Sequence, residues 1–156
     1  MIPDILTNTR TAKTKKGNKT ETTLRWWVTL LMALGLALGT WNPTGHHFIH
    51  YISSDFSNIL SGFTPFAIIL MLGVWILAIK SVFQSIGWGG TFFVLVIIGA
   101  FLWGLNSYGL IQFDNLKQMG WAGTLSVAFI IWVGINASII WKTLTGVYAT
   151  DVVEAE

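Results

Sequence analysis

The sequence predicts an all-α membrane protein, with four transmembrane helices in an antiparallel bundle and one amphipathic interfacial helix on the outer side. Two observations predict this class. Hydrophobic residues make up 53% of the 156-residue chain and charged residues 10%, whereas charged residues are about 25% of a typical soluble domain. The hydrophobic residues also gather into four long blocks, and a helix made from such a block can cross the hydrocarbon core of a bilayer.

The four blocks contain no acidic or basic residue apart from Arg25 at the start of the first. Tryptophan stands near the ends of most of them, and indole rings prefer the headgroup boundary of a bilayer. The second block joins the third through a short connection, Ser81–Gly87, and the Gly89-Gly90 pair is interpreted as a loop hinge. The spans are predicted at residues 24–41, 63–79, 88–105 and 121–141.

The first block has a second interpretation, as a signal peptide that is cleaved near the small residues Ala37 and Gly39. The polar region before the block is long for a signal peptide. Trp26 and Trp27 open the block, which is typical of an anchor at the membrane interface. We therefore expect the first block to remain in the protein as a span.

The distribution of positive charge predicts the orientation. The chain has nine Lys and Arg residues, and all of them except Lys117 fall on one side of a four-span arrangement. Because basic residues concentrate on the cytoplasmic side, both termini are predicted to be cytoplasmic. The longer connections, 42–62 and 106–120, then face outward. The basic residues on the predicted cytoplasmic side are Arg10, Lys13, Lys15, Lys16, Lys19, Arg25, Lys80 and Lys142.

Two tails flank the predicted transmembrane domain of residues 24–144. Residues 1–23 are predicted to be a flexible basic cytoplasmic tail, because Thr7–Thr23 is rich in Thr, Lys, Asn and Gly and has no apolar periodicity. Its basic residues serve as a topology signal or bind anionic lipid, where each contributes ~1 kcal/mol. Residues 145–156 are predicted to be an acidic cytoplasmic tail.

The first outer connection begins with a predicted turn. Pro43 disfavours helical geometry at Asn42 and has no amide proton, and Thr44 and Gly45 follow it. An amphipathic interfacial helix is expected at about residues 45–60, since its apolar side chains share one helical face. That face consists of Phe48, Ile49, Ile52, Phe56, Ile59 and Leu60.

Three histidines lie in this predicted helix. His46 and His50 are four residues apart and would project from one side of it, with His47 beside them. Imidazoles at this spacing can ligate Zn or Cu, or one can bind haem iron. The chain has no other His and no Cys, and imidazole also suits a polar helix face in contact with water. We expect no metal and no cofactor, with outer-face metal or haem binding as an alternative.

Polar and small residues inside the spans predict helix–helix contacts. An amide in hydrocarbon needs a partner, so Asn136 is expected to face another helix, in a bond worth roughly 0.6–2 kcal/mol. Small residues spaced by four permit close approach of two helices. Gly35 with Gly39 in the first span, and Gly134 with Ser138 in the fourth, have this spacing. These faces are predicted to meet each other or a second copy.

The chain has no sequence motif of catalysis: no Gly-x-Ser-x-Gly, no His-Glu-x-x-His, no Gly-Lys-Thr phosphate loop and no paired carboxylates within a span. It also has no basic stripe for nucleic acid. The sequence therefore predicts a non-enzymatic membrane protein that acts through helix contacts, as an accessory subunit or a self-associating bundle. The expected partners are the bilayer, a second copy or another membrane protein. The alternative is an oligomeric channel or transporter lined by Asn136, Ser138 and Ser126.

Two short runs carry a resemblance to a known family. They are Thr40–Gly45 (TWNPTG) after the first span and Leu144–Glu154 (LTGVYATDVVE) after the last. With them, the chain resembles a family of small uncharacterised bacterial inner-membrane proteins with four predicted spans, classed as a domain of unknown function. The resemblance covers essentially the whole membrane part. It implies a multi-pass protein of the bacterial inner (plasma) membrane, and it implies no activity, cofactor or partner.

Overall fold

The computed structural model describes residues 5–14, 17–54 and 56–145. The predicted acidic tail, apart from Thr145, lies outside these residues. The described elements are two strands, four α-helices and one short 3-10 helix. In chain order they are β1 (Thr7–Thr14), β2 (Gly17–Leu24), α1 (Trp26–Thr40), α2 (Phe48–Ser54), η1 (Phe56–Asn58), α3 (Thr64–Ser107) and α4 (Leu116–Thr145).

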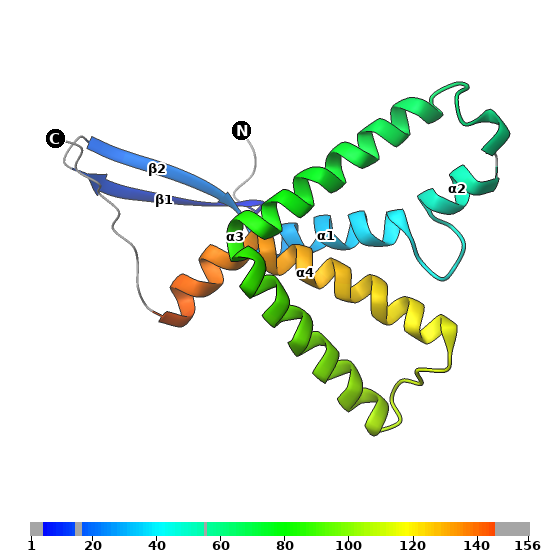
Figure 1. The fold of residues 1–156 in the computed structure, drawn as a ribbon. Coiled ribbons are helices and arrows are strands. Elements are labelled where there is room, and N and C mark those ends of the chain that lie inside the picture. Colours follow the sequence, from blue (N-terminus) through cyan, green and yellow to red (C-terminus); the bar gives the residue numbers. More distant parts are fainter. Residues whose placement is uncertain (1–4, 15–16, 55, 146–156) are drawn as a thin grey trace.

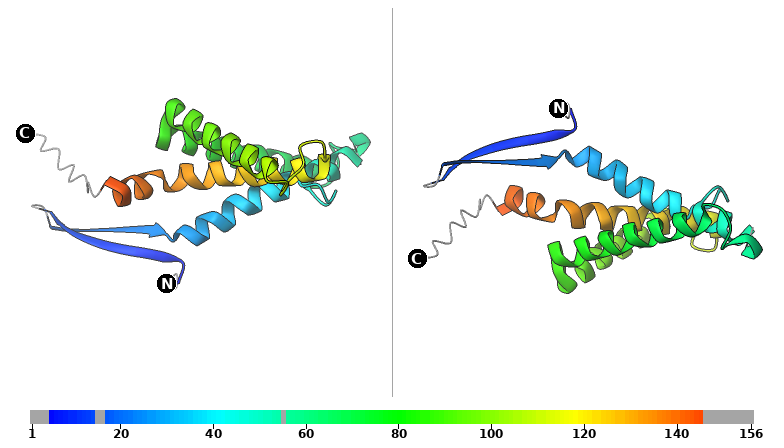
Figure 2. Two further views of the ribbon diagram at one scale, coloured as in Figure 1. Left: turned by 90° about the horizontal axis from the view of Figure 1, so that it is seen from below. Right: turned by 90° about the horizontal axis from the view of Figure 1, so that it is seen from above.

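The long helices run back and forth between two ends of the molecule (Figures 1 and 2). The connections 41–63 and 108–115 lie at one end, which we call the loop end. α1 begins, α3 bends and α4 ends toward the opposite side, which we call the terminal end. The predicted all-α class is confirmed in part, because the described chain is mostly helical but also contains the strands β1 and β2. Two helical segments, Thr64–Ser107 and Leu116–Ala137, are long and apolar enough to cross a membrane.

α3 bends sharply at Gly87. The residue has φ 67° and ψ 179°, a backbone conformation that glycine adopts without a steric cost. The bend divides α3 into two arms that spread apart in a V (Figure 1). The prediction of a connecting loop over Ser81–Gly87 is wrong, because helix continues to this single residue and resumes directly after it, through Gly89-Gly90.

α4 begins earlier than the predicted span at residue 121. Asn115 explains the difference, because its Oδ1 accepts the backbone N–H groups of Lys117 (3.1 Å) and Gln118 (3.2 Å). A side-chain oxygen in this position satisfies amide groups that have no partner inside the first helical turn. The cap adds helix at Leu116 on the N-terminal side of the predicted span.

The N-terminal region forms a hairpin in place of the predicted flexible tail. β1 and β2 pair antiparallel, with Thr7 opposite Leu24 and Thr14 opposite Gly17. Threonine is β-branched and suits an extended backbone, and strand pairing satisfies the amide and carbonyl groups without an apolar core. The N–H of Arg25 donates to the carbonyl of Leu6 at 3.0 Å, which joins the hairpin to the start of α1.

The predicted interfacial helix is shorter than residues 45–60. α2 covers Phe48–Ser54, and only η1 follows it in the described part of this segment. Gly45 has φ 82°, so the chain is not helical there. Ile49 and Phe56 of the predicted apolar face are 49% and 69% exposed, so the other helices do not cover this face.

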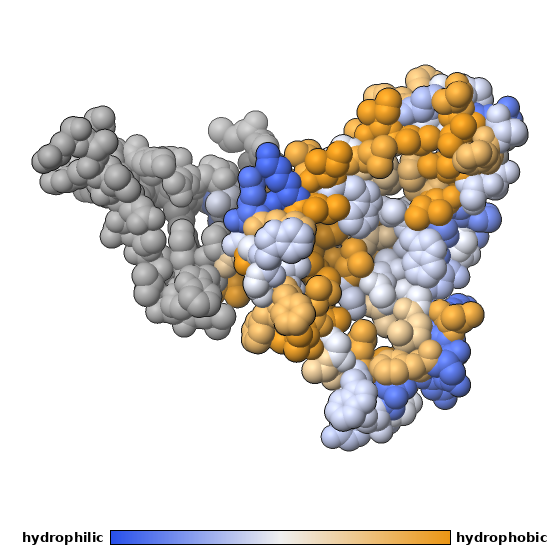
Figure 3. All heavy atoms as spheres, viewed as in Figure 1, coloured by the Kyte–Doolittle hydropathy of each residue, from blue (hydrophilic) through white to orange (hydrophobic). Residues whose placement is uncertain are grey.

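Small side chains form the contacts between the long helices. α4 contacts both α1 and α3 and is therefore the central helix. Among the described residues no large side chain is fully buried. Apolar surface consequently points outward over both arms of α3 (Figure 3). The buried apolar residues are Ala33, Ala37, Val82, Ala128 and Ile131.

α4 approaches α3 very closely at Gly134. A Cβ atom at this position would lie 2.6 Å from Cγ2 and 2.8 Å from Cα of Val82 in α3. The sequence predicts the first span or a second copy as the partner of the Gly134 face. The structure gives α3 instead, because the glycine lies where α4 crosses α3 just before its bend.

We expect Gly134→Ala to lower the free energy of unfolding by about 1–3 kcal/mol, since the added methyl group collides with the Val82 backbone. Unfolding of the purified protein in detergent micelles measures the change. Gly35→Ala is the matched control, because a Cβ at Gly35 has no atom within 4 Å. Adding Val82→Ala should restore only part of the loss, as the collision with the backbone of residue 82 remains. Equal stability of Gly134→Ala and the unchanged protein would contradict this packing.

Candidate functional site

A buried polar contact joins α1 to α4. Nδ2 of Asn136 donates to Oγ1 of Thr29 at 2.8 Å and also to the carbonyl of Trp132 at 2.8 Å. Both side chains are buried, each with 3% of its surface exposed. The Thr29 hydroxyl in turn donates to the carbonyl of Trp26 at 2.8 Å. The structure thus places Asn136 against another helix, with its amide nitrogen bonded both across the interface and within α4.

A second bond reinforces this contact. Nε1 of Trp132 donates to the carbonyl of Trp26 at 3.0 Å, across the same pair of helices. The polar contact between α1 and α4 thus consists of four residues, Trp26, Thr29, Trp132 and Asn136. All of their groups are neutral. The arrangement therefore suits adhesion between helices.

Another bond ties α1 to α3 nearer the loop end. Nε1 of Trp75 donates to Oγ1 of Thr40 at 2.9 Å, and Thr40 donates to the carbonyl of Leu36 at 2.7 Å. The predicted turn follows directly. Trp41 ends α1, and its N–H donates to the carbonyl of Ala37 at 3.0 Å.

Asn42 holds the predicted turn together. Its Nδ2 donates to the carbonyls of Leu38 (2.9 Å) and His46 (3.0 Å), and its Oδ1 accepts the N–H of Thr44 at 2.9 Å and also the Thr44 hydroxyl. One side chain therefore satisfies an open carbonyl of α1 and closes the following loop. Gly45 completes the turn with its positive φ, and its N–H faces the carbonyl of Asn42 at 3.5 Å.

The turn packs against α4 at Gly120, a contact that the sequence alone does not predict. A Cβ at Gly120 would lie 2.8 Å from Cγ of Pro43 and 2.8 Å from the Trp41 ring. The glycine is thus the counterpart of the Asn-Pro-Thr-Gly turn. The signal for this contact is weak in the sequence, since Gly120 and the turn lie far apart along the chain.

α1 has two faces of small residues, of which one packs against α4 and the other is exposed. Thr29, Ala33 and Ala37 are spaced by four and are buried, and they form the side of α1 that packs on α4. Gly35 and Gly39 are exposed, and a Cβ at either has no atom within 4 Å. The predicted Gly35–Gly39 face is therefore open in the single chain. The packed face has the same spacing of small residues, a signal that could have identified it.

The three histidines do not form the predicted pair on one helix. α2 begins at Phe48, so His46 lies outside it while His50 lies inside. Nδ1 of His47 accepts the N–H of His50 at 3.0 Å and so caps α2, and the two rings are 5.9 Å apart. Within the described ranges no three His, Asp or Glu side chains are grouped to hold a metal ion.

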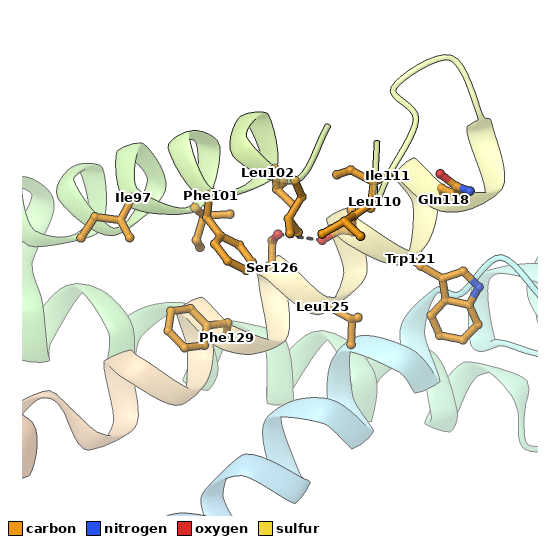
Figure 4. A pocket seen from close by; sticks show the side chains of 13 residues that line it. Ile97, Phe101, Leu102, Leu110, Ile111, Gln118, Trp121, Leu125, Ser126 and Phe129 are labelled. Carbon is orange, nitrogen blue, oxygen red and sulfur yellow. Dashed lines mark hydrogen bonds between the residues drawn. The ribbon is translucent and has the colours of Figure 1, made fainter. Parts of the chain in front are cut away.

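A long apolar crevice separates the second arm of α3 from α4 (Figure 4). Its volume is about 780 Å³, and its lining includes Ile97, Phe101 and Leu102 on α3. The facing wall comes from α4 and from the 108–115 connection. That second wall includes Leu110, Ile111, Gln118, Trp121, Leu125, Ser126 and Phe129.

Two of the residues predicted to line a channel, Ser126 and Asn136, lie in different surroundings within the single chain. Ser126 lines the apolar crevice and donates to the carbonyl of Ala122 at 2.6 Å, whereas Asn136 is buried against α1. The side chain of Ser138 lies outside the described part of the structure. The described residues thus place Ser126 and Asn136 on different sides of α4.

Comparison with known proteins finds one family. A family model described as "Family of unknown function (DUF6524)" matches residues 21–155, which include all four helices but not most of the hairpin. No curated protein matches the chain, and no solved structure matches it. The resemblance to an uncharacterised domain of unknown function is confirmed.

We expect Asn136→Leu and Thr29→Val each to destabilise the fold by roughly 0.6–2 kcal/mol, because each removes the bond between α1 and α4. In Asn136→Leu, the Thr29 hydroxyl still donates to the carbonyl of Trp26. In Thr29→Val, the Asn136 amide still donates to the carbonyl of Trp132. The double variant should therefore cost less than the sum of the two, which a double-mutant cycle of unfolding in micelles measures. Ser126→Ala is the control, with little expected change. Strict additivity of the two variants would contradict the bond.

Proposed function

The chain belongs to the DUF6524 family of unknown function, and we propose that it is a four-span membrane protein that acts through helix–helix contacts rather than catalysis. One observation carries the proposal. Only 6% of the most apolar stretch of α3 and 22% of that of α4 is buried inside the chain. Water is a poor solvent for so much apolar surface, so lipid or other membrane helices must cover it.

The helix lengths support four spans. A straight helix of the 44 residues of α3 would be about 66 Å long, roughly twice the ~30 Å hydrocarbon core. The bend at Gly87 turns this length into two arms, each able to cross once. α1 has 15 residues and rises about 22 Å, so it is a short span with Trp26 and Trp41 at its ends.

The charges support a cytoplasmic terminal end. Arg25 lies directly before α1, and Lys80 lies about two turns before the bend of α3, both toward the terminal end. Lys117 lies in the first turn of α4, at the loop end. Positive charge thus favours one side of the proposed bundle, as it does in multi-pass proteins of the cytoplasmic membrane. The inner membrane of a bacterium is our proposed location.

The polar groups within the helices support a role without catalysis. The hydroxyls of Thr91, Thr124 and Ser126 donate to carbonyls of their own helices, at 2.8, 3.0 and 2.6 Å. Thr29 and Asn136 bond to each other. These groups are therefore occupied within the protein, where they stabilise helices and their contacts.

The open face of α1 supports association with a second copy or another membrane protein. A Cβ atom at Gly35 or at Gly39 would have no described atom within 4 Å, so this face of α1 is open. Close approach of two backbones along such a face allows extensive van der Waals contact between helices. Since the contacts within one chain involve few buried side chains among the described residues, a second copy would add substantially to the packing. We propose self-association first and an accessory role second.

We expect reporter fusions to place both termini and the Gly87 bend in the cytoplasm, and the 41–63 and 108–115 connections outside. The expected pattern follows from an even number of passes with the loop end outward. Labelling of single cysteines introduced into the naturally cysteine-free chain provides the same information without a fusion. Termini in opposite compartments would refute the four-span arrangement.

We expect Gly35→Leu and Gly39→Leu to shift the protein from dimer to monomer, because the larger side chains keep a second helix away. Native mass spectrometry from mild detergent or nanodiscs measures the oligomer. Neither substitution should change the fold of one chain, since both positions are open. Gly99→Leu, at an equally open position of α3, is the control. A wild-type protein that is monomeric and brings no other protein with it would count against both forms of the proposal.

A further inference from the structure

We propose that the crevice between the second arm of α3 and α4 holds an acyl chain of an anionic phospholipid, whose phosphate is bound at the first two turns of α4. The inference rests on the proposed function, because it requires the crevice to lie within a bilayer. It assigns a ligand to a crevice that the described side chains of the protein do not fill.

The lining of the crevice favours an apolar occupant. Its volume of about 780 Å³ lies in the range of small-molecule sites, roughly 300–1,000 Å³. Two polar atoms of its lining have partners inside the chain: the Ser126 hydroxyl donates to its own helix, and Oε1 of Gln118 accepts the N–H of Gln112 at 2.7 Å. Aliphatic and aromatic side chains supply the rest, among them Phe101, Leu102 and Phe129 (Figure 4).

One end of the crevice has a different chemistry. Gln118 and Trp121 belong to its lining and lie in the first turns of α4. Lys117 directly precedes Gln118, and it lies one helical turn before Trp121, so these two positions are neighbours on the helix surface. The amide of Gln118 and the indole nitrogen of Trp121 both lie toward the loop end (Figure 4). In the described part of the chain, Nζ of Lys117, Nε2 of Gln118 and Nε1 of Trp121 donate no hydrogen bond.

These three groups are donors without acceptor capacity, so the group that complements them is an acceptor. A phosphodiester carries negative charge and several acceptor oxygens, and it is attached to two long apolar chains in a phospholipid. The backbone N–H groups of Lys117 and Gln118 are already bound by Asn115, so the side chains supply the free donors. Asp114, the nearest described acid along the chain, forms no ion pair with Lys117.

A second copy of the chain fits the crevice less well. A transmembrane helix brings backbone groups that are already paired, and its apolar side chains would leave the three donors unused. Phospholipid satisfies both ends at once, with hydrocarbon at depth and phosphate at the level where indole and ammonium groups meet headgroups. Charge and hydrogen-bond complementarity therefore favour the lipid.

The test measures lipid binding to the full chain in mild detergent by native mass spectrometry. The probes are dioleoyl phosphatidylglycerol and dioleoylglycerol, which has the same chains and no phosphate. We expect Lys117→Gln to weaken binding of the phospholipid about fivefold and to leave the diacylglycerol unchanged. Leu102→Trp fills the crevice and should weaken both. Lys80→Gln and Ile69→Trp, at exposed positions that do not line the crevice, are the matched controls.

Several results would overturn the proposal. They are unchanged phospholipid binding in Lys117→Gln or in Leu102→Trp, an equal loss in the controls, displacement of the lipid by inorganic phosphate alone, or cross-links between copies through the crevice. Ser126→Leu fills the crevice from α4 and replaces Leu102→Trp if that variant does not fold. The topology of the chain and its association through Gly35 are measured separately. Failure of the lipid test with both of those intact therefore rejects the lipid site alone.

Discussion

α4 approaches α3 so closely at Gly134 that a single methyl group would collide with the backbone of Val82. The same helix meets the Trp41–Pro43 turn at Gly120, where a methyl group would again collide. α4 also packs on the small side chains of α1, and just after Gly134 the side chain of Asn136 bonds to Thr29. Close approach allows many weak van der Waals contacts. In the membrane location that we propose, the helices would depend on these contacts, because burial of apolar surface between helices gains little in lipid. Two glycines of α4, which have no side chain, therefore determine how closely α3 and the turn after α1 pack against α4.

Satisfaction of polar groups imposes the second constraint. An unpaired amide or carbonyl in hydrocarbon costs several kcal/mol, so a chain that crosses a membrane must resolve each helix end locally. Asn42 does this at the end of α1, where one amide group binds two carbonyls and its oxygen accepts from Thr44. Asn115 does it at the start of α4. The Asn-Pro-Thr-Gly run is therefore a structural motif, in which the side chain of Asn42 ends one helix and Pro43 packs against the central helix α4.

The apolar blocks could be predicted from the sequence because the chemistry that produces them is local: a run without charge is readable in one dimension. The need of Asn136 for a partner is equally local, but the identity of that partner is not. Nothing along the chain relates Gly134 to Val82 or Gly120 to Pro43, since these contacts arise only when helices cross.

The exact position of the bend at Gly87 could not be predicted from the sequence, because Gly89 and Gly90 stand near it and only Gly87 adopts a positive φ. The hairpin escaped prediction for another reason: strand pairing there rests on backbone bonds and threonine rather than on apolar periodicity. His46 and His50 could be paired only on a helix that begins before His46, and α2 begins after His47.

Few large apolar side chains are buried inside the described part of the chain. The buried apolar side chains of the described residues are alanine, valine and isoleucine at helix crossings, and the bulky ones, such as Phe66, Phe92 and Trp103, point outward. A soluble protein would use such side chains to fill its interior, and their exposure would drive aggregation. In a bilayer the same exposure has no cost where lipid chains cover it, so large side chains can serve as the boundary with lipid while alanine and glycine serve as the contacts between helices. Two open features of the described chain differ in kind. Open space lies above Gly35 and Gly39, so a helix backbone can approach there. The crevice beside Phe101 has a volume of about 780 Å³, and its lining includes donors of Gln118 and Trp121 that the described residues leave unpaired. If the proposed function holds, these differences favour a protein helix at the first and a lipid at the second.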